Sequence, residues 1–149
     1  MKILVFGGSG FIGSNFINYC FKNDNYIILN VDSLTYASSN NSISVNDNYS
    51  FIKGDICNRH LMSKIIIDFK PDCIINFAAE SHVDNSIENS DEFIHTNING
   101  THTLLKMFYD LAHCTYFSAS NCSAIANELM NRLTDSLSTA PPTVAAITL

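Results

Sequence analysis

A chain of 149 residues has the length of a single domain, and a hydrophobic fraction of 46% is enough to build one core. The formal net charge is −6 and no basic cluster is present, so we expect no nucleic-acid partner. No run reaches the ~18 apolar residues of a membrane span, and five cysteines without a CxxC spacing predict neither a disulfide framework nor a zinc site. We expect a cytoplasmic protein that binds small molecules or another protein, and no membrane.

The first element is a short apolar run at residues 3–6, followed by a glycine-rich turn that opens into a helix at residues 11–22. Gly7, Gly10 and Gly13 have the spacing that lets a backbone turn sharply, approach a pyrophosphate and pack a helix on a strand. The N–H groups of the first helical turn can bind phosphate without a basic side chain. The pattern predicts a dinucleotide site, although a plain strand-to-helix connection uses similar residues.

A second apolar run at residues 26–31 predicts another strand, and Asp32 stands at its carboxyl end, 19 positions after Gly13. A carboxylate at this position accepts hydrogen bonds from the ribose hydroxyls and repels a 2′-phosphate. It therefore favours NAD over NADP as the cofactor. The alternative is an aspartate that only caps a turn.

The remaining strands are predicted at residues 50–53, 72–77 and 115–118, with helices at 59–69 and 90–112 between them. This alternation predicts an α/β fold with a doubly wound parallel sheet, strand order 3-2-1-4-5, and ligands at the carboxyl ends of the strands. The apolar face expected on the long helix consists of Ile94, Ile98, Leu104, Leu105, Phe108 and Leu111.

Four segments carry a more specific pattern. They are Gly-Gly-Ser-Gly-Phe-Ile-Gly at 7–13, Asp-Ser-Leu-Thr-Tyr-Ala at 32–37, Gly-Asp-Ile at 54–56, and Phe-Ala-Ala-Glu-Ser-His-Val-Asp-Asn-Ser-Ile at 77–87. Together they resemble the extended short-chain dehydrogenase/reductase family, and within it the dTDP-glucose 4,6-dehydratases. The likeness extends to about residue 114. Sugar-nucleotide epimerases share the glycines and the Gly-Asp pair, so an epimerase-like fragment is an alternative.

The resemblance implies an NAD site with separate contacts for each part of the cofactor. Residues 7–13 would hold the pyrophosphate, residues 32–35 the adenosine ribose, 55–56 the adenine, and 77–81 the nicotinamide half. Asp55 has an alternative role as a helix N-cap, and Ser81 would also touch the sugar substrate. The implied cofactor residues are Gly7, Gly10, Phe11, Ile12, Gly13, Asp32, Ser33, Leu34, Thr35, Asp55, Ile56, Phe77, Ala78, Ala79, Glu80, Ser81 and Thr96.

The segment after the fifth predicted strand departs from the family. Members carry a Ser-Thr-Asp-Glu run there and a helical Tyr-x-x-x-Lys pair, whose Tyr takes a proton while Lys lowers its pKa. Here the run reads Ser118, Ala119, Ser120, Asn121. Ala119 cannot relay a proton, Ser120 is a poor general acid at neutral pH, and Asn121 cannot act as a general base. We therefore assign no catalytic residue and leave open whether the chain is an enzyme.

Three other patterns are weaker candidates for a catalytic, substrate-binding or metal-binding role. Tyr49 and Lys53 repeat the Tyr-x-x-x-Lys spacing, but in a predicted strand they lie ~13 Å apart, so we interpret the match as coincidence. His82 either contacts substrate or is a structural histidine. His95 and His102 lie two turns apart on the long helix without a third candidate ligand, so we expect no metal site.

We divide the chain into a Rossmann-like NAD-binding domain at 1–114 and an atypical tail at 115–149 that is rich in Ala, Ser and Thr. In the tail we predict a helix at 123–137 and a sixth strand at 143–149. We expect the family's carboxy-terminal substrate lobe and its dimer interface to be missing.

Two functions follow from the resemblance. The first is the NAD-binding portion of a dTDP-glucose 4,6-dehydratase-like lyase, which eliminates water from a dTDP-hexose by transient oxidation with bound NAD. As given, this portion is catalytically incomplete and would bind a dTDP-sugar weakly. The second is a noncatalytic or remnant domain that binds NAD or another nucleotide.

Overall fold

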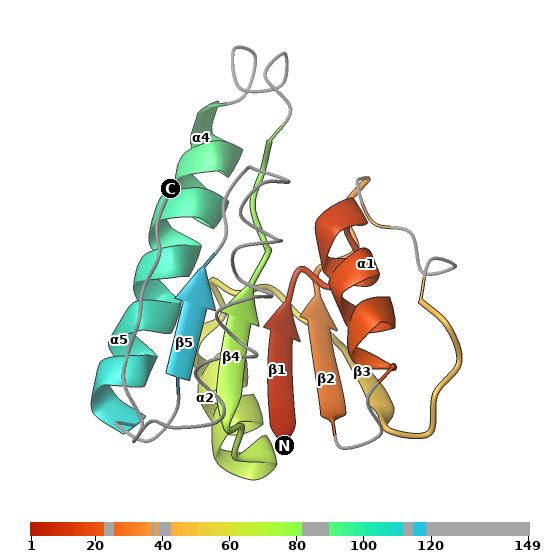
Figure 1. The fold of residues 1–149 in the computed structure, drawn as a ribbon. Coiled ribbons are helices and arrows are strands. Elements are labelled where there is room, and N and C mark those ends of the chain that lie inside the picture. Colours follow the sequence, from red (N-terminus) through yellow and green to blue (C-terminus); the bar gives the residue numbers. More distant parts are fainter. Residues whose placement is uncertain (23–25, 37, 39–42, 82–89, 112–114, 119–149) are drawn as a thin grey trace.

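The computed structural model describes residues 1–22, 26–36, 38, 43–81, 90–111 and 115–118 (Figure 1). Within these ranges, five parallel strands form one sheet in the order β3-β2-β1-β4-β5. The strands are β1 (Lys2–Phe6), β2 (Ile27–Asp32), β3 (Tyr49–Lys53), β4 (Cys73–Asn76) and β5 (Thr115–Ser118). The helices are α1 (Phe11–Cys20), α2 (Arg59–Phe69), α4 (Ser90–Phe93), the π-helical η2 (Ile94–Gly100) and α5 (Thr101–Leu111).

The predicted α/β class and strand order are confirmed. The predicted strands and helices differ from the observed ones by a few residues at their ends, apart from the long helix described below. None of the helices in the described ranges combines the length and apolar character needed to cross a membrane. The predicted helix at 123–137 and strand at 143–149 lie outside the described residues.

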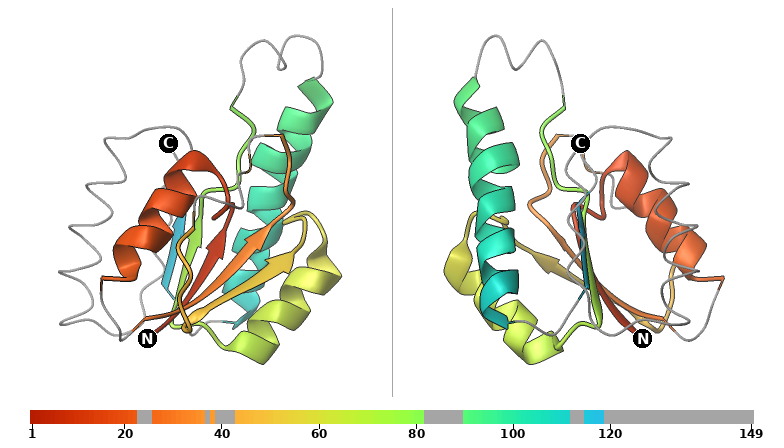
Figure 2. Two further views of the ribbon diagram at one scale, coloured as in Figure 1. Left: turned by 90° about the vertical axis from the view of Figure 1, so that its right-hand side faces the viewer. Right: turned by 60° about the vertical axis from the view of Figure 1, so that its left-hand side comes forward.

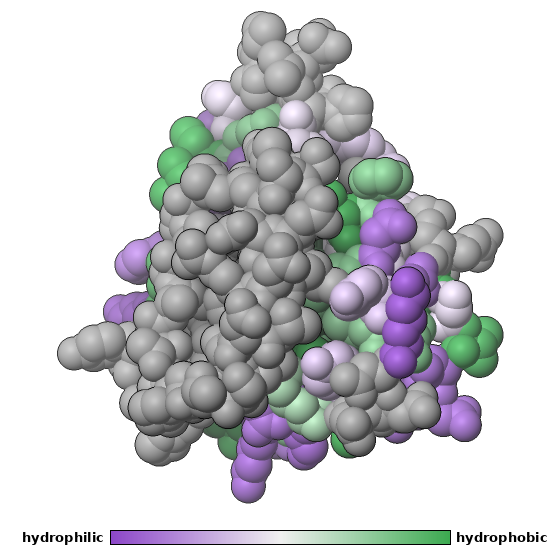
Figure 3. Space-filling view, viewed as in Figure 1, coloured by the Kyte–Doolittle hydropathy of each residue, from purple (hydrophilic) through white to green (hydrophobic). Residues whose placement is uncertain are grey.

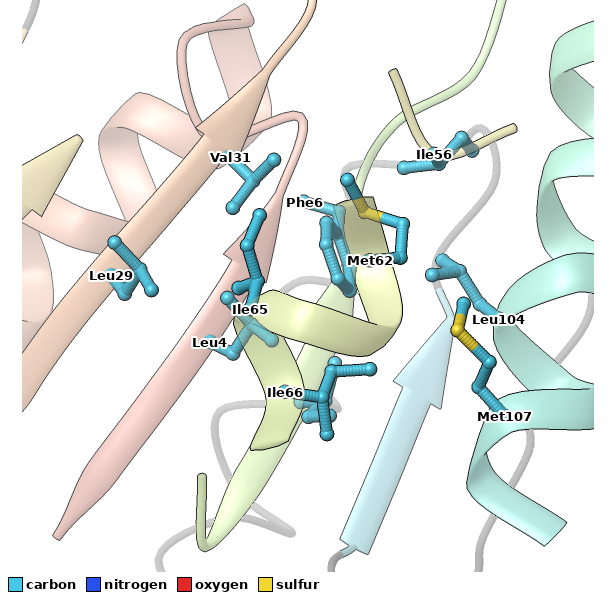
Figure 4. Packing of buried hydrophobic residues seen from close by; sticks show 11 residues of the cluster. Leu4, Phe6, Leu29, Val31, Ile56, Met62, Ile65, Ile66, Leu104 and Met107 are labelled. Carbon is cyan, nitrogen blue, oxygen red and sulfur yellow. The ribbon is translucent and has the colours of Figure 1, made fainter. Parts of the chain in front are cut away.

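Helices cover both faces of the sheet, as a doubly wound fold requires. Figure 2 shows α1 on one face, with α2 and α5 on the other. Successive side chains of a strand point to opposite faces, so β1 contributes to two cores. Ile3 and Val5 pack on the α1 side, while Leu4 and Phe6 pack against α2 and α5 (Figure 4).

Buried apolar strands thus explain why the sheet forms the centre of the molecule. The side chains of Leu4, Val5 and Phe6 are completely buried, which is typical of parallel strands covered on both faces. On the outer surface, hydrophilic and hydrophobic side chains are interspersed over the described part of the face in Figure 3.

The apolar face predicted for the long helix is wrong at its first two positions. Ile94 and Ile98 are 48% and 60% exposed, whereas Leu104 is buried and Leu105 packs against the core. The reason is that residues 94–100 are π-helical. Backbone hydrogen bonds there join residues five apart, so positions spaced for an α-helix no longer share one face with α5. The side chains at 108 and 111 are outside the described set.

Candidate functional site

The described residues line an open cavity of about 400 Å³ at the carboxyl edge of the sheet. This edge, where β1 lies between β2 and β4, is where open α/β sheets bind ligands. The wall comes from the segments that follow β1 to β4 and from the start of the long helix. Its residues are Gly7, Gly10, Val31, Asp32, Ser33, Thr35, Tyr36, Ser38, Gly54, Asp55, Ile56, Phe77, Ala78, Ala79, Glu80, Glu92, His95 and Thr96.

The glycine turn between β1 and α1 has the geometry that its spacing predicts. Gly7 has a φ of +71°, and a Cβ there would come within 2.6 Å of the Ala78 Cα. A Cβ on Gly13 would overlap the Gly7 carbonyl oxygen and lie 2.6 Å from the Gly8 Cα, so α1 packs directly on the turn. Gly10 differs, because its nearest neighbour would be the Gly7 carbonyl oxygen at 3.5 Å. It leaves open space at the cavity wall.

The start of α1 is suited to an anion. Gly10 is the N-cap and has no side chain that accepts from the first turn, and the first turn contains no acidic residue. The first N–H groups of a helix have no partners within it, and they carry the positive end of the helix dipole. A phosphate beside Gly10 would therefore find donors in the backbone.

A buried amide fixes the shape of the glycine turn. The Asn30 Oδ1 accepts from Gly8 N at 3.0 Å, and the Asn30 Nδ2 donates to Ser9 Oγ at 3.1 Å and to the Tyr49 hydroxyl at 3.0 Å. Sequence reasoning missed this role, although an Asn inside an apolar strand is a signal for it. Burial raises the pKa of Tyr49, which lies in β3 with Lys53, opposite to the shift that a catalytic base needs.

Asp32 ends β2 and is 6% exposed. Its Oδ2 accepts from Ser9 N at 2.9 Å, which joins the carboxylate to the glycine turn. Its Oδ1 accepts from Leu34 N at 2.8 Å and from Ser38 Oγ at 2.9 Å. Asp32 thus caps the turn after β2 and also lines the cavity, so the two sequence interpretations are compatible.

Asp55 and Ile56 lie together beyond β3. Asp55 is exposed on the cavity wall, and its Oδ1 accepts from Cys57 N at 2.8 Å. The alternative role of Asp55 as a helix cap is wrong, because α2 is capped by Asn58, whose Oδ1 accepts from Leu61 N at 3.0 Å. Ile56 is buried in the core cluster and also contributes to the wall, which gives this end an apolar surface.

The opposite wall follows β4. Ala78 and Ala79 line it, and the Asn76 Oδ1 accepts from Ala78 N at 3.0 Å. The Tyr36 hydroxyl donates to Glu80 Oε2 at 3.1 Å, which connects the segment after β2 to the segment after β4. The two small alanines leave the backbone accessible to a flat ligand.

Five predicted contact residues do not line the cavity. Leu34 has a positive φ of 58° and uses its backbone N–H on Asp32, Phe11 is 84% exposed, and Ser81 is exposed. The five are Phe11, Ile12, Gly13, Leu34 and Ser81. The wall includes six residues that sequence reasoning missed, of which Tyr36 and Gly54 stood in the quoted motifs. The six are Val31, Tyr36, Ser38, Gly54, Glu92 and His95.

The expectation that His95 has no further candidate ligand beside it is wrong. Asp55 and Cys57, which are distant in sequence, lie next to it, while His102 is not part of this group. The Cys57 thiol donates to the His95 carbonyl oxygen at 3.1 Å, and burial together with Asp55 raises the pKa of Cys57 to about 11. His82, Ala119, Ser120 and Asn121 lie outside the described residues.

Known proteins match most of the length of this chain. The model of the GDP-mannose 4,6 dehydratase family matches residues 4–124. The dTDP-glucose 4,6-dehydratase of Haemophilus influenzae is 42% identical over 116 residues, which are 76% of this chain and 34% of the relative. This chain spans about a third of the length of the curated relatives it matches.

Solved structures agree with the sequence relatives. The Bacillus anthracis dTDP-glucose 4,6-dehydratase in complex with NAD has a TM-score of 0.71 at 38% identity, covering 81% of this chain and 37% of that one. The Thermotoga maritima UDP-glucose 4-epimerase with UDP-glucose has a TM-score of 0.73 at 28% identity, covering 81% and 38%. The fold is common to both enzymes, and the identity is higher to the dehydratase. The chain belongs to the GDP-mannose 4,6 dehydratase family, and its resemblance to the dTDP-glucose 4,6-dehydratases is confirmed.

Proposed function

We propose that this chain binds NAD in the cavity at the carboxyl edge of the sheet, as the cofactor-binding portion of a dTDP-glucose 4,6-dehydratase-like lyase. The observation that carries the proposal is the hydrogen bond from Ser9 N to Asp32 Oδ2 at 2.9 Å. It joins the turn suited to phosphate to the carboxylate suited to ribose. A dinucleotide needs both groups at a fixed separation, and a phosphate ion alone needs only the first.

Asp32 supports a preference for NAD over NADP. Its two oxygens accept three hydrogen bonds from the described residues, and a carboxylate has about four acceptor positions. A ribose hydroxyl can use the remaining position or replace the Ser38 hydroxyl. A 2′-phosphate would meet the buried negative charge directly, which costs binding energy.

The two ends of the cavity suit the two bases of the cofactor. Ile56 offers an apolar surface, and Asp55 offers an acceptor for the adenine amino group. Ala78 and Ala79 would lie beneath the nicotinamide half. The volume of about 400 Å³ is within the usual range for small-molecule sites.

The lyase assignment rests on the relatives, of which the chain spans about a third. NAD supplies transient oxidation of the sugar in such enzymes, and Ser81 is the residue of this chain that we propose for sugar contact, with weak affinity for a dTDP-sugar. Ala119, Ser120 and Asn121 stand where the family's proton-transfer residues are expected, which favours a noncatalytic NAD-binding domain as the second candidate. Cys20 and Cys57 form no disulfide bond in the described part of the chain, which fits a cytoplasmic location.

Calorimetric titration of the chain with NAD+ and NADP+ tests cofactor binding. We expect saturable NAD+ binding, at least about tenfold weaker NADP+ binding, and a smaller difference between them in Asp32→Asn. Asp68→Asn, an exposed carboxylate on α2, is the matched control and should bind like the parent. A folded chain that does not bind NAD+ would contradict the proposal.

Turnover separates the two candidate functions. With NAD+ and dTDP-glucose present, loss of the sugar substrate followed by NMR would support the lyase. Intact NAD+ binding without turnover would favour the noncatalytic domain.

A further inference from the structure

We propose that Asp55, Cys57 and His95 form a zinc site at one end of the cavity. Their ligand atoms, a carboxylate oxygen, a thiol sulfur and an imidazole nitrogen, all lie within 4.8 Å of one another. Thiolate, imidazole and carboxylate are the three ligand types that Zn²⁺ accepts in proteins. Hard cations such as Mg²⁺ prefer oxygen ligands alone.

The local backbone brings the three groups together. The hydrogen bond from Cys57 N to Asp55 Oδ1 folds residues 55–57 into a tight turn. The Cys57 thiol in turn donates to the carbonyl oxygen of His95 at 3.1 Å. His95 lies in the π-helical η2, a type of helix that is frequent at functional sites. The sulfur therefore already contacts the helical turn that carries the imidazole.

The spacing of two of the ligands fits one tetrahedral ion. His95 Nε2 and Asp55 Oδ2 are 3.5 Å apart. Two ligands of a tetrahedral zinc, each about 2.0–2.2 Å from the metal, lie about 3.3–3.6 Å from each other. The His95 and Asp55 side chains are 56% and 51% exposed, so they can adjust and the ion can enter. Three protein ligands leave a fourth position for water.

The site overlaps the cofactor site, because Asp55 and His95 both line the cavity. Under the proposed function, on which this step rests, Asp55 accepts from the adenine of NAD. A carboxylate bound to zinc is no longer available to adenine, and the ion would lie at the cavity wall. We therefore expect zinc and NAD+ to compete for binding at this end of the cavity.

Direct metal titration tests the site without the cofactor. We expect the chain to bind one Zn²⁺ by calorimetry and to show no saturable binding of Mg²⁺. Co²⁺ in place of zinc should give the charge-transfer absorption of a thiolate ligand. Cys57→Ser should abolish that band, and Cys57→Ser and His95→Gln should each weaken zinc binding more than about tenfold.

His102→Gln is the matched control, since it removes an exposed histidine of the neighbouring α5 and should bind zinc as the parent does. His95 is itself exposed, so His95→Gln tests the site without disturbing the core. The proposal is overturned if the parent chain binds no zinc, if Co²⁺ shows no thiolate band, or if His95→Gln binds zinc like the parent.

Competition is measured separately. With zinc at ten times its own Kd, the apparent Kd for NAD+ should rise about tenfold in the parent, because only about a tenth of the chain stays metal-free. The same zinc concentration should have little effect on NAD+ binding by His95→Gln. Failure of NAD+ to bind without zinc would reject the proposed function, whereas the zinc titration alone decides the metal site.

Discussion

Asn97 holds the backbone of Glu80 by two hydrogen bonds. Its Oδ1 accepts from Glu80 N at 2.8 Å, and its Nδ2 donates to the Glu80 carbonyl oxygen at 2.9 Å. The pair joins η2 to the segment after β4, so one side chain sets the separation of two walls of the cavity. A side-chain amide suits this contact, because it donates and accepts from one planar group.

Asn97→Asp should therefore loosen this wall. An aspartate keeps the acceptor but loses the donor, and its charge faces the Glu80 carbonyl oxygen. We expect the free energy of unfolding to fall by about 1–2 kcal/mol and NAD+ affinity to fall with it, as measured by urea denaturation and calorimetry. Asn99→Asp, at an exposed position of the same helix, is the control. Equal stability of the two variants would show that the double hydrogen bond contributes nothing.

Gly10→Ala and Gly13→Ala should separate ligand binding from folding. The nearest atom to an alanine Cβ at Gly10 would be the Gly7 carbonyl oxygen at 3.5 Å, and the backbone there is extended. The Tm of Gly10→Ala should therefore stay within a few degrees of that of the parent. The methyl group would occupy space that the pyrophosphate needs, and NAD+ affinity should fall by at least about tenfold. At Gly13 the Cβ overlaps backbone atoms, so Tm should fall. Thermal denaturation and calorimetry on both variants test this, and unchanged NAD+ binding by Gly10→Ala would contradict it.

Asn30→Leu should cost more stability than Tyr49→Phe. The leucine leaves the buried Gly8 N–H and Ser9 hydroxyl without their Asn30 partner, whereas the phenylalanine removes one acceptor of the Asn30 Nδ2. We expect a loss of about 2–4 kcal/mol for the first and about 1 kcal/mol for the second. Urea denaturation of both variants measures the difference. A smaller loss for Asn30→Leu would mean that the turn keeps its shape without the amide.

The fold was predictable because its signals are local. The apolar runs, the alternation of strand and helix, and the spacing of Gly7, Gly10 and Gly13 are all read from neighbouring residues, and each corresponds to one element or turn. The place of Asp32 on the cavity wall was predictable for the same reason, since it stands at a fixed distance after the glycines.

The predictions that failed concern features that depend on long-range contacts or on departures from ideal helices. The hydrogen bond between Tyr36 and Glu80 joins residues 44 positions apart, and neither residue signals it alone. The exposure of Ile94 and Ile98 follows from π-helical geometry, which a periodicity of 3.6 does not detect. His95 reaches Asp55 only through the packing of η2 beside the turn after β3.

The buried thiol of Cys20 should make stability depend on alkaline pH. Burial raises the pKa of Cys20 from 9.0 to about 12, so the unfolded chain loses this proton at a lower pH than the folded one. The unfolded state binds fewer protons in this window, and the free energy of unfolding falls as pH rises from about 9 towards 12. Cys20→Ala removes this contribution, so its stability should decline less steeply than that of the parent. Urea denaturation of both chains at pH 8, 9 and 10 compares the slopes, and parallel slopes would show that the Cys20 thiol titrates alike in the two states.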